Sequence, residues 1–148
     1  MPHDIRTLSR RWFDEVWNNR RTEAIHELSH PHAVTYGLGE GGGPGTIADF
    51  IPFYQRFLAT FPDLKITVED VIAEGDKTAI RIHATGTHTG DAMGVPPTGK
   101  RVLFTAIIWT RWKDGKIIEG WNEVDMWGLM QQIAPPPPAV QAPKLKAL

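Results

Sequence analysis

From Lys65 onward, apolar residues alternate with polar ones, and this two-residue period is the pattern of a half-buried β-strand. The stretch KITVEDVIAEGDKTAIRIHATGTHTG contains two such runs, which meet at EGDK, residues 74–77. A second pair of runs, KRVLFTAIIWTRWKDGKIIEGWNEVD, meets at the Asp-Gly turn of KDGK, residues 113–116. Glycine-containing connections of this kind predict two β-hairpins, the first with a loop of three to five residues. We therefore expect four antiparallel strands at the centre of the fold.

The residues before the hairpins follow a helical period instead. Residues 4–19 repeat apolar side chains at spacings of three and four, which predicts one amphipathic helix with an aromatic-rich face. A short helix is expected over 22–28, with Thr22 as its N-cap, and a longer one over 46–61. Pro52 lies either in the first turns of this longer helix or at a bend in it.

Four further segments complete the chain up to the tail. Residues 30–37 are β-like, and residues 37–46, GLGEGGGPGT, are expected to form a mobile loop that serves as a lid or a rim. DAMGVPPTGK, residues 91–100, is expected to be a rigid connection between the hairpins. Residues 126–133 are apolar at helical spacing and predict a last helix.

Helices first and antiparallel strands after them are typical of an α+β domain, in which a curved sheet carries its helices on one face. We assign residues 1–134 to this domain. Residues 135–148 are rich in proline and alanine and offer no apolar face, so we expect a flexible or polyproline-II tail that folding does not require.

Charge and cysteine content narrow the class of protein. Sixteen basic and 17 acidic residues leave a net charge of −1, which gives no indication of a nucleic-acid or membrane-surface partner. The chain has no cysteine and therefore neither disulfides nor thiolate metal sites. No stretch approaches the roughly 18 apolar residues of a membrane span, and the N-terminus lacks the apolar core of a signal peptide. A soluble, cytoplasmic protein is expected.

Several ordered blocks of the sequence are similar to those of a known family. The blocks are FPDLKITVEDVIAEGDK, GTHTGDAMGVPPTGKRV, KDGKIIEGW and DMWGLMQQI. Together they resemble the SnoaL-like polyketide cyclases, within the larger group of nuclear-transport-factor-2-like cone folds, from about Ile5 to Ile133. The resemblance implies a strongly curved antiparallel β-sheet wrapped around the N-terminal helices, which forms a cone with an apolar internal cavity. It also implies homodimers that pair through their sheets.

The same resemblance implies ring closure by intramolecular aldol chemistry, with an Asp as acid and base and with no metal or organic cofactor. Aligned through DGK, the catalytic Asp of the family falls on Asn122. A His and a Gln that accompany it fall on Ile108 and Ala106, and an Asn falls on Thr35. Because an amide has no titratable proton near neutral pH, Asn122 cannot serve as a general base. The usual family mechanism is therefore not expected here.

The alternation of the strands gives an independent prediction of the pocket. If Asn122 faces inward, Ile118 and Gly120 of the same strand do so too, while Glu119, Trp121 and Glu123 face outward. On the neighbouring strands the expected inward residues are Phe104, Ala106 and Ile108, and then Ile80, Ile82, Ala84 and His88. This register predicts a mainly apolar pocket with few polar anchors, as in many ligand cavities.

The opposite face of the same strands predicts an interface. It gathers Arg81, His83, Trp109, Arg111, Glu119, Trp121 and Glu123. Opposite charges on neighbouring strands can pair, and large exposed aromatics beside them are typical of contact surfaces. A homodimer through the outer sheet face is expected.

Three residues are candidates for catalysis. Asn122 could orient a carbonyl or epoxide oxygen, or it could satisfy backbone groups at a strand end. Asp125 precedes MWGLMQQ and is well placed as an N-cap, with proton transfer as the alternative. His88, in GTHTG, titrates near neutral pH and is the candidate acid or base, or else a hydrogen-bonded structural histidine.

A second set of residues is expected to bind the ligand: Trp17, Thr35, Tyr54, Phe104, Ala106 and Ile108. Aromatic residues at helical spacing, such as Trp17 and Tyr54, are also typical of a hydrophobic core. His30 and His32, in SHPH, have no clear third ligand nearby, so no metal site is expected.

Two functions stay open from the sequence. One is a cofactor-independent lyase, isomerase or cyclase that acts on a hydrophobic, oxygenated small molecule. The other is a non-catalytic protein that binds such a molecule in the same cavity. An epoxide-hydrolase-like enzyme is less favoured, because it requires an Asp–Arg–Asp set that faces inward, and the sequence does not place one there.

Overall fold

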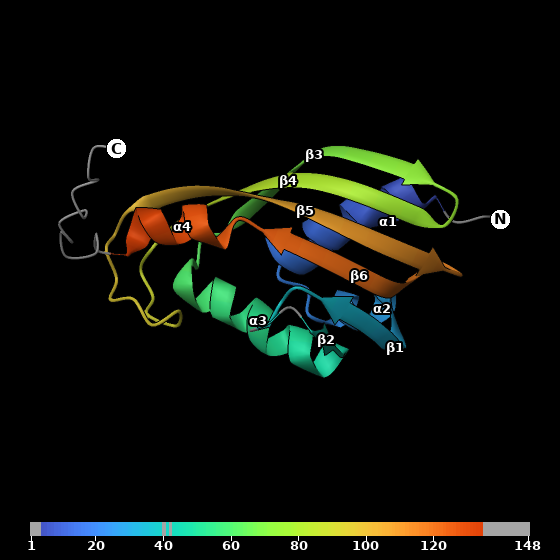
Figure 1. The fold of residues 1–148 in the computed structure, drawn as a ribbon, viewed down its shortest axis with the longest axis horizontal. Helices are drawn as coiled ribbons and strands as arrows, with labels where there is room; N and C mark the ends of the chain where they lie inside the picture. Colours follow the sequence, from blue (N-terminus) through green and yellow to red (C-terminus); the bar gives the residue numbers. More distant parts are fainter. Residues whose placement is uncertain (1–3, 40, 42, 135–148) are drawn as a thin grey trace, which may run out of the picture.

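The computed structural model describes residues 4–39, 41 and 43–134, and it consists of a six-stranded sheet with helices packed on one face (Figure 1). The helices are α1 (Ile5–Arg11), the π-helix η1 (Trp12–Asn18), α2 (Glu23–Leu28), α3 (Ile47–Thr60) and α4 (Met126–Ile133). The strands are β1 (Ser29–Tyr36), β2 (Pro44–Gly45), β3 (Lys65–Glu74), β4 (Lys77–Thr87), β5 (Arg101–Lys113) and β6 (Lys116–Val124). The expected tail, residues 135–148, lies outside the described residues.

The strands follow the order β2-β1-β6-β5-β4-β3 in an open sheet (Figure 1). The expected antiparallel pairing is confirmed for β3–β4, β4–β5 and β5–β6. The short strand β2 pairs antiparallel with β1, although residues 37–46 were expected to be a loop throughout. β1 and β6 differ, because they are parallel. The chain runs through α3 and both hairpins before it returns beside β1, and a long connection of this kind permits parallel pairing. The α+β class predicted from the sequence is therefore confirmed, with one parallel pair inside the sheet.

Both predicted hairpins form, and both have two-residue turns. Gly75 and Asp76 join β3 to β4, so the loop is shorter than the three to five residues expected. Asp114 and Gly115 join β5 to β6 with φ angles of 51° and 77°. Two positive φ angles in succession give a turn whose twist matches the flanking strands, which explains the Asp-Gly pair.

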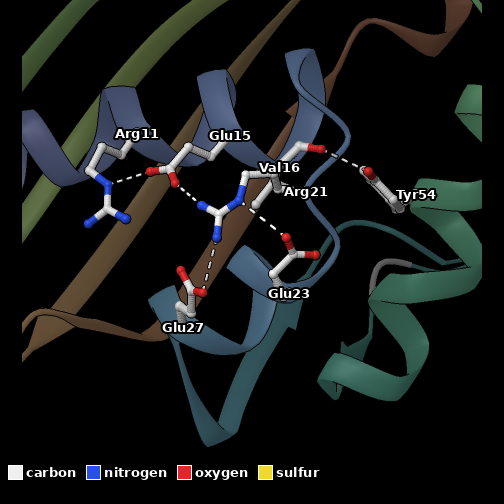
Figure 2. Close-up of polar contacts among 7 residues, drawn as sticks. All are labelled: Arg11, Glu15, Val16, Arg21, Glu23, Glu27 and Tyr54. Atoms are coloured by element: carbon white, nitrogen blue, oxygen red, sulfur yellow. Dashed lines mark hydrogen bonds and ion pairs between the residues drawn. The ribbon is translucent and has the colours of Figure 1, made fainter.

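The N-terminal helix is not the single α-helix predicted over residues 4–19. Its second half, η1, is a π-helix, and side chains from other elements bind the carbonyl groups near its end. The hydroxyl of Tyr54 donates to the Val16 carbonyl at 2.8 Å (Figure 2). The guanidinium of Arg20 donates to the carbonyls of Trp17, Pro62 and Leu64. These tertiary hydrogen bonds are invisible to a periodicity argument, which is why the wider turn was not predicted.

Two amide side chains bind the sheet where a neighbouring strand is missing. The Asn18 side chain bonds both the N–H and the C=O of Ile66 on β3, each at 2.8 Å. On β5, the Gln132 side chain bonds the N–H of Leu103 at 3.0 Å and its C=O at 2.8 Å. Each amide therefore satisfies a donor and an acceptor that a further strand would otherwise have taken.

A chain of ion pairs joins η1 to α2 (Figure 2). Glu15 pairs with Arg11 on one side and with Arg21 on the other, and Arg21 also pairs with Glu23 and Glu27. The hydrogen bond from Arg11 holds the pKa of the Glu15 carboxyl below its usual range. Because the Glu15 side chain is 19 % exposed, its pairs are better shielded from water than those of Glu23 and Glu27.

Thr22 lies at the N-cap position of α2, as predicted, but its side chain makes no capping hydrogen bond. Its φ and ψ angles of −63° and −31° are those of a helical residue, whereas a capping residue usually has extended backbone. Thr46 of α3 does have extended backbone, and its N–H donates to the Asp49 carboxylate at 2.7 Å. The capping interaction is therefore made at α3 rather than at α2.

The inner face of the sheet follows the predicted alternation. Ile80, Ile82, Ala84, Phe104 and Ala106 are all buried against the helices. Ile118 was predicted to face inward, and this placement is wrong. A β-bulge pairs Arg111 with Glu119 but Trp112 with Ile117. The bulge skips Ile118, so Ile117 rather than Ile118 lines the space inside the sheet.

Among the described residues, none of the helices combines the length and apolar character that crossing a membrane requires.

The ion pairs of Glu15 lead to a pH-dependent prediction. A carboxyl whose pKa is lowered in the folded state stabilises the fold above its unfolded pKa of about 4.5, and loses this contribution as the pH falls. Glu15→Gln should lower the free energy of unfolding at pH 7 by about 1 kcal/mol, with a much smaller loss at pH 3. Urea unfolding at both pH values measures this, and added salt should reduce the difference.

Asp14→Asn is the matched control, since it removes one negative charge from the adjacent position of the same helix. The exposed Asp14 side chain has no ion pair within the described part of the chain. An equal loss of stability in both variants at pH 7 would contradict the role given to Glu15.

Candidate functional site: an apolar pocket with an amide at its mouth

A pocket of about 110 Å³, here called the inner pocket, lies between the inner face of the sheet and the helices. Aromatic and aliphatic side chains form most of its wall: Trp12, Phe13, Trp17, Ile47, Phe50, Phe53 and Phe57 from the helices, and Ile80, Ile82, Phe104, Ala106, Ile108, Trp112, Ile117 and Val124 from the strands. Its polar lining residues are Ser9, Ser29, Thr35, Thr46, Thr110 and Asn122. Such a wall suits an apolar ligand with few polar groups.

Aromatic rings fix the helical side of this pocket. The edge of Trp17 meets Tyr54 with ring centroids 5.0 Å apart, and it also contacts Phe50 and Phe57 of α3. Phe57 in turn lies 5.8 Å from Phe104 of β5. These edge-to-face and tilted contacts hold η1, α3 and the sheet at fixed distances, so the pocket is preformed.

Asn122, at the end of β6, is held by β1. Its amide Nδ2 donates to the Thr35 hydroxyl and to the Tyr36 carbonyl, each at 2.9 Å. Since a carbonyl oxygen only accepts, the bond to Tyr36 fixes which end of the amide is nitrogen. Both Nδ2 protons are therefore used, and the oxygen Oδ1 points elsewhere. Gly37 makes this contact possible: its φ is +84°, and any Cβ there would overlap the Asn122 carbonyl.

A second hollow of about 450 Å³, here called the outer hollow, adjoins the inner pocket. Gly37, Leu38 and Gly39, the α3 residues Phe53, Arg56 and Phe57, and Met93, Glu123, Met126 and Met130 line it together with Asn122 and Val124. Asn122 lines both spaces, as do Leu38, Phe53, Phe57 and Val124, and it is the one polar residue among these five. No described residue donates a hydrogen bond to Oδ1, which leaves it as an acceptor for a ligand.

Five of the six expected ligand-binding residues line the inner pocket: Trp17, Thr35, Phe104, Ala106 and Ile108. Tyr54 is not among the lining residues. Its side chain is 2 % exposed, and its hydroxyl is taken by the Val16 carbonyl. Burial also raises the pKa of Tyr54, so its phenol stays neutral. Tyr54 supports Trp17 from behind rather than meeting a ligand.

His88 is fully buried, as an inward-facing residue should be, but it lines neither hollow. The Thr98 backbone N–H donates to its Nδ1 at 3.2 Å, and the Thr98 hydroxyl lies 2.9 Å from the same nitrogen. The hydrogen of the neutral ring is therefore on Nε2, which has no hydrogen-bond partner in the described part of the chain. Packed against Phe61, this histidine holds the 91–100 connection in place.

Asp125 caps α4, as predicted: its carboxylate accepts from the Gly128 N–H at 2.9 Å. It lines neither the inner pocket nor the outer hollow. Among the described residues of the inner pocket wall, none is an Asp, Glu, His, Lys or Arg. The three candidates for catalysis are thus not brought together, and Asn122 alone reaches the pocket.

The described residues contain no group of three His, Asp or Glu side chains placed to hold a metal ion. His30 and His32 lie beside each other with ring centroids 5.6 Å apart. Both lie in β1, and the His32 backbone N–H donates to His30 Nδ1 at 3.0 Å, so this ring nitrogen is already engaged.

A buried hydrogen-bonded chain at the deep end of the pocket was not predicted from the sequence. Trp112 Nε1 donates to the Thr78 hydroxyl at 3.0 Å, and the hydroxyls of Thr78 and Ser9 lie 3.1 Å apart. The Ser9 hydroxyl donates to the Ile5 carbonyl at 2.7 Å. The signal was present: Ser9 interrupts an apolar helical stripe at a spacing of four, and Thr78 continues the alternation of Ile80 and Ile82.

The fold and this pocket can now be set beside known proteins. The family model of the SnoaL-like polyketide cyclases matches residues 7–133. The chain belongs to the SnoaL-like polyketide cyclase family. Among curated proteins, the chain is similar to nogalonic acid methyl ester cyclase of Streptomyces nogalater. The two are 28 % identical over 128 aligned residues, and the alignment covers 83 % of this chain and 92 % of the cyclase.

Solved structures agree with this family membership. The chain superimposes on IdmH of Streptomyces antibioticus, a proposed polyketide cyclase, with a TM-score of 0.79, 32 % identity and coverage of 88 % of this chain and 98 % of that one. AclR of Streptomyces galilaeus, a proposed hydroxylase, gives a TM-score of 0.76 and 33 % identity, with coverage of 84 % and 77 %. The solved structures that this chain resembles thus include a proposed cyclase and a proposed hydroxylase.

Asn122→Asp tests the placement of the amide. An Asp here would be surrounded by Phe104, Ala106 and Ile108, and it would face the Tyr36 carbonyl, which repels a negative charge. Both effects raise the pKa of the new carboxyl in the folded state above the value of about 3.9 for an unfolded Asp. Stability relative to wild type should therefore be greatest at pH 4 and below, and it should fall as the pH rises through the folded pKa.

Urea unfolding between pH 4 and 8 measures this, with wild type as the baseline. Asn19→Asp, at an exposed position, is the control and should show no such loss. If Asn122→Asp were as stable relative to wild type at pH 8 as at pH 4, the amide would not be shielded from water as described.

Proposed function

We propose that this SnoaL-like protein binds a hydrophobic, oxygenated small molecule of polyketide type, with its apolar body in the inner pocket and one oxygen on Asn122. The single observation that carries this is the free acceptor Oδ1 at the boundary between the apolar pocket and the outer hollow. A ligand hydroxyl or enol at this boundary would donate to Oδ1. Family membership and the name of the cyclase from Streptomyces nogalater support the chemical class of the ligand.

The pocket favours a ligand that is neutral along most of its length. The charged residues at its entrance are Arg56 and Glu123, which line the outer hollow but not the inner pocket. An ionic group in the inner pocket would lose its water without gaining a charged partner among the lining residues, which is costly. Phenols, enols and ketones meet the requirement, because each forms hydrogen bonds while uncharged.

Catalysis by the same site is the second candidate, and membership in a cyclase family favours it. An aldol ring closure removes a proton from a carbon beside a carbonyl and delivers one to the new alkoxide. No ionisable side chain of the described pocket wall can carry out these transfers, so they would pass between the substrate and water. The protein would contribute by folding the substrate and by orienting an enol on Asn122. Turnover of a diketone by the wild-type chain distinguishes this role from binding alone.

A pair of matched ligands tests the binding proposal. Naphthalene and 2-naphthol differ by one hydroxyl, which should donate to Asn122 Oδ1. Wild type should bind 2-naphthol about three- to tenfold more tightly, the size of one net hydrogen bond. Asn122→Leu should abolish the difference, because it removes the acceptor while keeping a side chain of similar size. Calorimetric or fluorescence titration measures the dissociation constants.

The control for this titration is Asn19→Leu, which makes the same substitution at an exposed position outside the pocket. It should retain the wild-type preference for 2-naphthol. Equal affinity of wild type for the two ligands would refute the role of Asn122, and failure to bind either would refute the ligand class.

We also propose that two copies pair through the outer face of the sheet. Leu103, Ile107 and Trp109 are about half exposed along β5, although such side chains are usually buried. Of the charges expected to pair there, Arg111 and Glu119 do form an ion pair. Arg81 and Glu123 do not pair with each other, because the sheet register places Ile107 between them. Trp121 is covered in part by stacking on Tyr36, 5.6 Å away.

Ile107→Glu should convert the dimer to monomers, because it replaces an exposed apolar side chain at the centre of this interface by a charged one that must lose water when the copies meet. Sedimentation velocity at micromolar concentration measures the change. Ala48→Glu adds the same charge to an exposed position of α3 and should leave the dimer intact. A wild-type chain that sediments as a monomer would be decisive against the interface.

A further inference from the structure

A row of hydroxyl-bearing residues crosses the inner face of the sheet. Strand pairing places Thr35 of β1 beside Gly120 of β6, Gly120 beside Thr110 of β5, and Thr110 beside Thr78 of β4. Three threonines and a glycine thus lie side by side on four successive strands. The next row towards the mouth contains Asn122 and Ile108. The row is a polar band on a wall that is otherwise mainly apolar.

The three hydroxyls of the row are engaged to different degrees. Thr78 is saturated by Trp112 and Ser9, as described above. Thr35 accepts from Asn122, while its own proton has no acceptor among the described residues. Thr110 is 3 % exposed and lines the inner pocket, and its hydroxyl makes no hydrogen bond with any described residue.

Thr110 is therefore a buried residue whose hydroxyl is open to the pocket. Within the described part of the chain, the one side-chain polar atom that is sealed from solvent and has no partner is His88 Nε2. The Thr110 oxygen is not in that condition, so it retains accessible surface, and the inner pocket is the space that it borders. A nearly buried hydroxyl of this kind gains a full hydrogen bond when a ligand oxygen reaches it.

Gly120 leaves a gap between the two available hydroxyls. A Cβ built there would come no closer than 3.9 Å to the Thr35 hydroxyl and 4.0 Å to the Trp109 carbonyl, so the space above the backbone is open. Neighbouring strands lie about 4.8 Å apart, which puts Thr35 and Thr110 about 10 Å apart across the glycine. A six-membered ring with an oxygen on each side fits a span of this size.

We propose that the gap over Gly120 is a ring-binding subsite, in which Thr110 bonds one ligand oxygen and the Thr35–Asn122 pair bonds another. The ligand class is an uncharged carbocycle or aromatic ring that carries oxygens on opposite sides. A threonine hydroxyl can donate to a ketone and accept from a phenol, so both oxidation levels are recognised. This inference rests on the proposed function and adds the position and oxygen pattern of the ring.

Three ligands and two variants test the subsite by titration. In wild type, 2,6-dihydroxynaphthalene should bind about three- to tenfold more tightly than 2-naphthol, because its second hydroxyl reaches Thr110. Thr110→Val keeps the shape of the side chain and should abolish this gain while it leaves the preference for 2-naphthol over naphthalene unchanged. Thr105→Val, on the exposed face of the same strand, should keep both gains.

Gly120→Ala tests the gap itself. Its new Cβ meets its nearest neighbours at ordinary contact distances, so the variant should fold with wild-type stability, while the methyl group occupies the space of the ring. Affinity for all three ligands should fall at least tenfold. Gly43→Ala is the control, because nothing lies within 4 Å of its Cβ position and it lines neither hollow.

The outcomes separate this inference from the function on which it rests. If 2-naphthol binds better than naphthalene but the second hydroxyl adds nothing, the subsite is wrong and the proposed function stands. The same holds if the second gain survives Thr110→Val, or if Gly120→Ala binds like wild type. If none of the three ligands binds the wild-type chain, the proposed function fails and the subsite fails with it.

Discussion

The two hydrogen bonds from Asn122 to β1 determine much of the chemistry of this pocket. They join the ends of two parallel strands that are far apart in the sequence, and Gly37 allows the close approach that they require. Because both protons of the amide nitrogen are used within the protein, the oxygen is the part of the amide left for a ligand to bind. The same strand pairing sets Thr35 opposite Gly120. An acceptor, a free hydroxyl proton and an open patch of backbone are thus placed together by one local arrangement.

The sequence was sufficient to predict the hairpins and the inner face of the sheet, because alternation depends on the strand alone and not on what packs against it. Phe104, Ala106 and Ile108 could be assigned to the pocket for this reason. Features that depend on a partner elsewhere in the chain could not be predicted. The π-helix depends on Tyr54 and Arg20, and the bulge that exchanged Ile118 for Ile117 depends on how β5 and β6 fit together.

The same limit applied to the candidate site. Tyr54 and His88 have polar atoms, and the sequence could not show that the Val16 carbonyl and Thr98 bind them. Once those partners are known, both side chains are part of the framework. The described pocket wall is left with amide and hydroxyl groups and without an ionisable one. This composition supports the proposal that the site recognises uncharged oxygens. It belongs to the residues of this chain and does not follow from the fold that the chain shares with its relatives.

The amide side chains of Asn18 and Gln132 also affect how copies of this protein can meet. Open sheets risk joining edge to edge, since the free N–H and C=O groups of an edge strand can pair with another molecule and seed a growing fibre. Here Ile66 and Leu103 offer no such groups, because the two amides already occupy them. The opposite edge is β2, which has two residues, one of them a proline. Edge-to-edge pairing is therefore hindered at Ile66, at Leu103 and along β2, and contacts made by side chains are the alternative at these places.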